Sequence, residues 1–177
     1  MEKKNDFMRT LVVFYSRTGN TRLVSEAIAR SLNADVEEIK DKRSRDGALG
    51  FLRSGYEAIF GRLSCIEPTE KGPEGYDLVI IGSPVWAGRL SSPVRTYMSL
   101  YGNKIKKVAF FATCSVGSGK IFKQMKEISK PPIATLEIKE REVLSGDYMK
   151  KIEDLKLMLE NETRGTSLKK ADNTFLI

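Results

Sequence analysis

The sequence predicts an α/β fold in which a five-stranded parallel sheet is covered by helices on both faces, a doubly wound arrangement. Strand and helix patterns alternate five times along the 177 residues. The strand candidates are continuous apolar runs rather than alternating ones, as in sheets buried on both faces. A chain of this length with 41% hydrophobic and 30% charged residues suits one globular domain. We predict that the domain spans residues 9–162, between flexible polar tails at 1–8 and 163–177.

The strand candidates are short apolar runs bounded by turn residues, and the clearest is residues 78–81. The others are residues 11–15, 36–39, 108–112 and 133–138. Helices are predicted at 22–32, 91–100, 120–129 and 148–160. The first of these helices has an apolar face formed by Leu23, Ala27, Ile28 and Leu32. The last has one formed by Met149, Ile152, Leu155 and Leu159.

Residues 41–68 form a longer connection than is usual between two strands. The connection contains arginines at four positions, Arg43, Arg45, Arg53 and Arg62. It also has a helical pattern of apolar residues, Leu49, Leu52, Tyr56, Ile59, Phe60 and Leu63. In one interpretation this is a crossover helix that packs on the sheet. In the other it borders a cofactor pocket or makes a subunit contact, which would allow a homodimer.

The amino-acid composition excludes several classes of catalytic and metal-binding site. Histidine is absent, which excludes histidine-based acid–base chemistry, Ser-His-Asp triads and most zinc-enzyme sites. The only cysteines, Cys65 and Cys114, are far apart in sequence, so we predict no zinc ribbon, no iron–sulfur cluster and no metal. No apolar run approaches the ~18 residues that span a bilayer. The first residues also lack the apolar stretch of a signal peptide, so we expect a cytoplasmic protein.

The loop after the first strand has the parts of a phosphate site. The loop opens the first helix and consists of Ser16, Arg17, Thr18, Gly19, Asn20 and Thr21. Its side chains supply hydroxyls, its glycine permits close backbone approach, and the helix N-terminus offers free N–H groups and a positive dipole end. It is neither a Walker A loop nor the dinucleotide fingerprint GxGxxG. The alternative is an ordinary polar helix cap without a ligand.

Two further loops follow the third and fourth strands, at the same edge of the sheet. The second loop contains the only tryptophan, a rigid aromatic suited to a flat ring, and its candidate residues are Ser83, Pro84, Val85, Trp86, Ala87 and Gly88. The third is rich in small residues, and its candidates are Thr113, Cys114, Ser115, Gly117 and Gly119. Cys114 is either a small buried hydrophobe or a thiol beside a ligand.

The pattern S-x-T-G-N-T after the first strand resembles the phosphate loop of flavodoxins, and the likeness covers roughly residues 9–160. The resemblance implies the short-chain form of that fold, with the predicted strands in the order 2-1-3-4-5 and one bound FMN. It implies that the first loop binds the FMN phosphate. It also implies that Trp86 stacks on the flavin or walls it, and that Ala87 and Gly88 meet its N5 edge. Flavodoxins commonly carry an acidic residue and a tyrosine in the third loop, and this sequence has neither between Thr113 and Gly119.

The resemblance implies an electron carrier without catalytic residues. The alternative is a small FMN oxidoreductase that uses NAD(P)H or a quinone, which the open third loop and the arginines favour. A third class is a binding module that has lost FMN and uses its basic surface for a partner. The net charge of +7 departs from the acidic surface typical of flavodoxins, so a redox partner protein is expected to be acidic, and nucleic acid is not an expected partner.

Overall fold

The computed structural model describes residues 8–45 and 47–172. A central sheet contains five parallel strands: β1 (Thr10–Phe14), β2 (Asp35–Glu38), β3 (Leu78–Trp86), β5 (Lys107–Cys114) and β6 (Thr135–Lys139). Their order is β2-β1-β3-β5-β6, which confirms the predicted order 2-1-3-4-5. The tails predicted at 1–8 and 163–177 lie partly outside the described residues, at 1–7 and 173–177.

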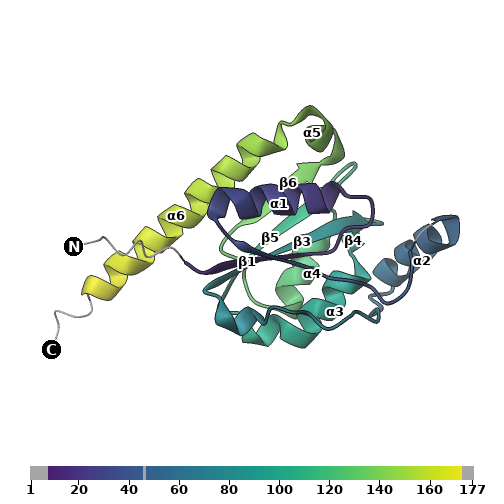
Figure 1. The fold of residues 1–177 in the computed structure, drawn as a ribbon, viewed down its shortest axis with the longest axis horizontal. Helices are drawn as coiled ribbons and strands as arrows, with labels where there is room; N and C mark the ends of the chain where they lie inside the picture. Colours follow the sequence, from purple (N-terminus) through teal and green to yellow (C-terminus); the bar gives the residue numbers. More distant parts are fainter. Residues whose placement is uncertain (1–7, 46, 173–177) are drawn as a thin grey trace.

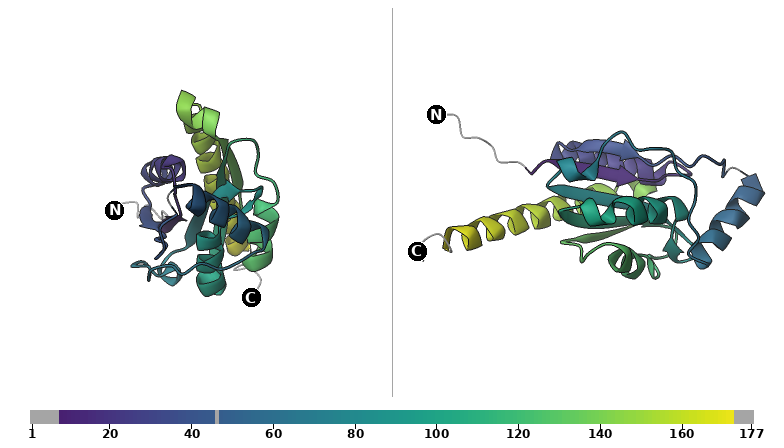
Figure 2. Two further views of the ribbon diagram at one scale, coloured as in Figure 1. Left: turned by 90° about the vertical axis from the view of Figure 1, so that its right-hand side faces the viewer. Right: turned by 90° about the horizontal axis from the view of Figure 1, so that it is seen from below.

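Helices cover both faces of this sheet (Figure 1). The helices α1 (Asn20–Leu32) and α6 (Tyr148–Asp172) lie on one face, and α3 (Ser92–Tyr101) and α4 (Ile121–Ile128) lie on the other. Short 3-10 turns, η1 (Pro73–Gly75) and η2 (Gly102–Lys104), lead into β3 and β5. The short helix α5 (Glu140–Ser145) follows β6. The helix α2 (Gly47–Ile59) stands out beyond the carboxyl ends of the strands (Figures 1 and 2).

The strand β1 divides the core into two layers because successive side chains of a strand point to opposite faces. Leu11 and Val13 join the cluster beneath α3 and α4, whereas Val12 and Phe14 join the cluster beneath α1 and α6. All of these side chains are buried. The continuous apolar run therefore reflects burial on both faces, as predicted.

Two predicted boundaries and two predicted core-face residues need correction. The strand β3 continues to Trp86 because it pairs with β5 as far as Pro84 and then turns into an antiparallel hairpin with β4 (Arg89–Leu90). Residues 163–172, predicted as a tail, extend α6 to Asp172, since no proline interrupts that stretch. On the helices Leu23 and Met149 are 43% and 50% exposed, so neither lies in the core face assigned to it.

The helix α2 is oriented opposite to its apolar pattern. Its buried residues are Gly50, Ser54, Glu57 and Ala58. The apolar residues on it and just after it are exposed: Leu49, Phe51, Leu52, Tyr56, Ile59, Phe60 and Leu63. The prediction that these side chains pack on the sheet is therefore wrong, and the reason is the polar network described below. A subunit contact through this apolar surface stays a prediction.

Close packing at Gly82 gives a test of the sheet. Gly82 of β3 pairs with Phe111 of β5, and a Cβ added at Gly82 would lie 2.0 Å from Cζ of that ring. We expect Gly82→Ala to lower the free energy of unfolding by ~1–3 kcal/mol, the cost of overpacking. The control is Gly55→Ala in α2, where nothing lies within 4 Å of an added Cβ and helix propensity favours alanine. Urea denaturation of both variants measures the difference, and equal stability of the two would contradict the packing.

Candidate cofactor site

The first loop brings the N-terminus of α1 to the carboxyl edge of the sheet. Gly19 is the N-cap residue and has φ 97, a left-handed conformation that favours glycine. Its N–H donates to Ser16 Oγ over 3.2 Å, and no side chain caps the helix. The first turn of α1 contains no acidic residue. The free N–H groups of this turn and the positive dipole end are therefore directed at whatever lies beyond it.

The second loop is a tight hairpin that fixes Trp86. Ala87 and Gly88 connect β3 to β4 with φ values of 49 and 69, as in the primed turns typical of two-residue hairpins. Trp86 is only 7% exposed, and its ring meets Tyr15 edge-on with centroids 5.6 Å apart. The guanidinium of Arg45 lies over the indole, 5.1 Å from its centroid. Of the two roles implied by the resemblance, this packing favours a wall over a free stacking plate.

The third loop begins later than predicted because Thr113 and Cys114 are the last residues of β5. Thr113 Oγ1 lies 2.7 Å from Thr21 Oγ1, so this strand end is joined to the first loop. The N–H of Lys120 donates to the carbonyl of Gly88, which joins the third loop to the second. A Cβ at Gly119 would lie 2.3 Å from that carbonyl oxygen, so glycine is required for this close approach.

These segments enclose a pocket of about 270 Å³. Its lining includes many of the predicted residues: Arg17, Thr18, Asn20, Thr21, Pro84, Val85, Trp86, Thr113, Cys114 and Ser115. The lining does not include Ser16, Gly19, Ser83, Ala87, Gly88, Gly117 and Gly119. Ser83 is fully buried and bonds to Ser91, which gives it a structural role. Burial raises the pKa of Cys114 to about 11, so the thiol is neutral at physiological pH.

Glu140 lines the same pocket and was missed by the sequence analysis. Its Oε1 accepts from the Asn20 side chain over 3.2 Å, and its Oε2 accepts from Ser115 Oγ over 3.0 Å. Glu137 of β6 also reaches the third loop, where it accepts from the N–H of Ser118. The carboxylates that the third loop lacks in sequence therefore come from the end of β6 and the start of α5. An acidic residue directly after the last apolar strand is the signal that could have found Glu140.

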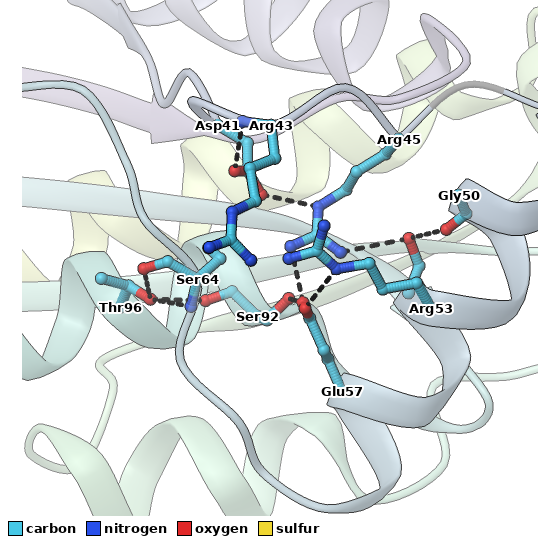
Figure 3. A network of polar contacts seen from close by, with 10 residues as sticks. Asp41, Arg43, Arg45, Gly50, Arg53, Glu57, Ser64, Ser92 and Thr96 are labelled. Carbon is cyan, nitrogen blue, oxygen red and sulfur yellow. Dashed lines mark hydrogen bonds and ion pairs between the residues drawn. The ribbon is translucent and has the colours of Figure 1, made fainter.

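A buried ion network attaches α2 to this edge of the sheet (Figure 3). The side chain of Arg45, 2% exposed, donates to Asp41 and Glu57 at 2.6 Å each. Glu57 also accepts from Arg53 and from Ser92 at the start of α3. Burial alone would raise the pKa of Glu57, but the hydrogen bonds from Arg45, Ser92 and Arg53 outweigh it and hold that pKa below its usual value. Ser54 and Glu57 of α2 face inward because they form hydrogen bonds with Arg45 and Ser92 there.

The network limits which of the four arginines in residues 41–68 can bind an anion. Arg45 and Arg53 are held by acidic partners. Arg43 and Arg62 are exposed, and neither side chain forms an ion pair among the described residues. Only these two remain available to an anionic ligand or an acidic partner.

A comparison of the sequence with family models decides the family. The model described as Flavodoxin matches residues 9–162. The chain belongs to the flavodoxin family. A search of curated proteins finds no match for this flavodoxin.

Solved structures agree on the flavodoxin fold. A flavoprotein from Lactobacillus acidophilus in complex with FMN is 24% identical with a TM-score of 0.65, and the alignment covers 78% of this chain and 97% of that one. A flavoprotein from Bacteroides eggerthii is 23% identical with a TM-score of 0.64, covering 75% and 88%. One from Bacteroides uniformis is 19% identical with a TM-score of 0.66, covering 75% and 91%.

No helix within the described residues is long and apolar enough to cross a membrane. In the same part of the chain, no group of three or more cysteine, aspartate and glutamate side chains has an arrangement that could hold a metal ion.

The lowered pKa of Glu57 makes part of the stability depend on pH. We expect Glu57→Gln to lower the free energy of unfolding at neutral pH by ~3 kcal/mol, because it leaves Arg45 partly unpaired. A carboxyl group with a lowered pKa stabilises the fold above its unfolded pKa and loses that effect as pH falls through its folded pKa. The gap between wild type and Glu57→Gln should therefore narrow on acidification.

Urea denaturation between neutral and acidic pH measures this gap. The control is Glu38→Gln, which removes an exposed pair with Arg22 and should cost no more than ~1 kcal/mol. A loss in Glu57→Gln no greater than in the control, or a gap independent of pH, would contradict the network.

Proposed function

We propose that this flavodoxin binds FMN at the carboxyl edge of its sheet, with the FMN phosphate at residues 16–21. The observation that carries the proposal is the open N-terminus of α1, which has a left-handed Gly19, no side-chain cap and no acid in its first turn. An anion at this position would satisfy N–H groups that lack helical partners and meet the positive end of the dipole. The FMN complex of the Lactobacillus acidophilus flavoprotein supports the choice of ligand.

The remaining pocket residues suit the rest of such a ligand. Thr18 and Asn20 present a hydroxyl and an amide beside the phosphate position. Trp86 and Val85 give an apolar wall, and the neutral thiol of Cys114 adds a small apolar surface. The contact between Gly88 and Lys120 holds the second and third loops together. The hydrogen bonds of Glu140 span Asn20 and Ser115, so FMN must compete with this carboxylate for both donors.

Electron carriage is the activity that the pocket supports best. Bound FMN would supply the redox chemistry, and the protein would supply binding and electrostatics. Among the lining residues, Glu140 is the only carboxylate, histidine is absent and Cys114 holds its proton. Transfer of single electrons to a partner needs no acid or base from the protein. An acidic partner protein is part of the same proposal because the net charge is +7. A cytoplasmic location is also part of it, because the first residues lack the apolar stretch of a signal peptide.

The second candidate is an FMN oxidoreductase that uses NAD(P)H or a quinone. It is favoured by the tip of the third loop, where Val116 is 88% exposed and no aromatic side chain lies between Thr113 and Gly119. A flavin face left open there would be accessible to a small substrate.

Two substitutions test the binding site in opposite directions. Thr18→Ala removes a hydroxyl offered to a doubly charged phosphate, a bond worth ~1.5–3 kcal/mol, so FMN affinity should fall roughly tenfold to a hundredfold. Glu140→Gln removes a negative charge from the pocket and leaves one acceptor oxygen in place of two for Asn20 and Ser115, so affinity should rise. Titration of flavin fluorescence measures both changes. Unchanged affinity in both variants would place the phosphate elsewhere.

A turnover assay separates the two candidate activities. An electron carrier loaded with FMN should not oxidise NADH or NADPH with a quinone faster than free FMN does. Its electron transfer to an acidic protein should slow as salt rises, because salt screens the attraction within about 8–10 Å. Saturable NADH or NADPH oxidation well above the free-FMN rate would instead establish the oxidoreductase.

A further inference from the structure

A second hollow lies beside α2, separate from the candidate FMN pocket. It has a volume of about 600 Å³ and is lined by Arg43, Arg53, Tyr56, Glu57, Arg62, Leu63, Ser64 and Cys65. That volume is within the ~300–1,000 Å³ typical of small-molecule sites. None of these residues lines the FMN pocket. The hollow is therefore a distinct concave site with its own chemistry.

The arginines around this hollow outnumber the carboxylates that pair with them. The carboxylates of Asp41 and Glu57 are both bonded to the buried Arg45, and Glu57 also holds Arg53. The guanidinium groups of Arg43, Arg45 and Arg53 project toward one another (Figure 3). Arg43 and Arg62 line the hollow without an acidic partner among the described residues. An anion would therefore be attracted to the hollow.

A further guanidinium, that of Arg95, lies close to Gly61, the residue before Arg62. Cζ of Arg95 would be 3.8 Å from a Cβ placed on Gly61. Its Nε and Nη2 are buried and have no hydrogen-bond partner, and burial together with the charge of Arg89 lowers its pKa. Ser64 Oγ, on the lining of the hollow, is also buried and unpartnered. Arg95 thus adds positive charge beside this turn, and the hydroxyl of Ser64 lies buried at the lining of the hollow.

The lining also has an apolar side. Tyr56 and Leu63 are 52% and 57% exposed, so each presents a large apolar surface to solvent. Guanidinium forks bind phosphate oxygens in pairs, and a tyrosine ring stacks on a flat aromatic ring. We propose that this hollow binds a phosphate monoester whose molecule also contains a flat aromatic ring, with Arg43 and Arg62 on the phosphate and Tyr56 against the ring.

The position of the hollow connects it to the redox site. Glu57 lines the hollow and bonds to Arg45, and Arg45 lies over Trp86, which walls the FMN pocket. A ligand here would be connected to that pocket through the side chains of Glu57, Arg45 and Trp86. As a place for the phosphate of an electron donor, the hollow rests on the second candidate function, the oxidoreductase. As an anion site it does not, because the two linings share no residue.

Cys65 provides a reporter inside the hollow. It is an exposed free thiol on the lining, whereas the thiol of Cys114 is buried and its pKa is raised to about 11. Iodoacetamide should therefore alkylate Cys65 first, and a ligand in the hollow should slow that reaction. The experiment uses protein that has been loaded with one equivalent of FMN and freed of unbound FMN, because FMN is itself an aromatic phosphate ester. Adenosine 2′-monophosphate, adenosine or inorganic phosphate is added, and alkylation is followed by mass spectrometry.

We expect adenosine 2′-monophosphate to protect Cys65 at lower concentration than inorganic phosphate, and adenosine not to protect it. In the double variant Arg43→Gln, Arg62→Gln, the concentration of phosphate ester that gives the same protection of Cys65 should rise at least tenfold for each guanidinium removed. The control variant Arg30→Gln, Lys126→Gln removes two exposed cations elsewhere and should behave as wild type.

Equal protection in the double variant and wild type would overturn the proposal, as would protection by adenosine alone. The absorption spectrum reports FMN binding separately, so failure of the hollow and failure of the FMN site are distinguishable. An FMN-free protein whose Cys65 is still protected by the ester would retain the anion site and reject only its link to redox chemistry.

Discussion

The buried guanidinium of Arg45 is the interaction on which the functional end of this molecule depends. Its hydrogen bonds to Asp41, Ser54 and Glu57 fix the start of the long connection to the helix α2. Its contact with Trp86 fixes the wall of the candidate FMN pocket. Through Glu57 it also reaches Ser92 at the start of α3. A buried charge without such partners is costly, so each partner holds the others in place.

The same network explains why α2 carries its apolar residues outward. Hydrophobic periodicity identifies the face that would be buried if burial of apolar area decided the orientation. Here Arg45 and Ser92 lie at the sheet edge and donate hydrogen bonds to Ser54 and Glu57, which therefore face inward. Gly50 lies so close to the backbone of Arg45 that a Cβ would meet its carbonyl oxygen at 2.2 Å, which admits only the glycine face. The hollow that we assign to a phosphate ester is lined by the same helix, by the exposed Tyr56 and by the buried Glu57.

Most of the fold could be predicted because the central strands β1, β3 and β5 are almost entirely buried. Their sequences, such as residues 78–81, are apolar without alternation, and their separation by helical patterns predicts a parallel sheet. The hairpin of β4 was missed because two residues, Arg89 and Leu90, carry no strand signal. The orientation of α2 was missed because the decisive partners lie far apart in sequence, from Asp41 to Ser92.

The candidate site, too, has features that the sequence could predict and features that it could not. The loop at 16–21 could be recognised because its residues are contiguous and their chemistry is local. The burial of Trp86 beneath Arg45 and the reach of Glu140 to Asn20 could not, because both depend on how distant segments meet. These contacts turn a family resemblance into a specific hypothesis about how this chain holds its ligand.

We propose above that FMN lies at the carboxyl edge of the sheet with its phosphate on the first turn of α1. Titration of FMN into isotopically labelled protein, followed through backbone amide chemical shifts, locates the bound ligand. We expect the largest changes at Thr18, Gly19, Asn20 and Thr21, with further changes near Trp86 and Ser115. Changes confined to another surface, with residues 16–21 unmoved, would contradict it.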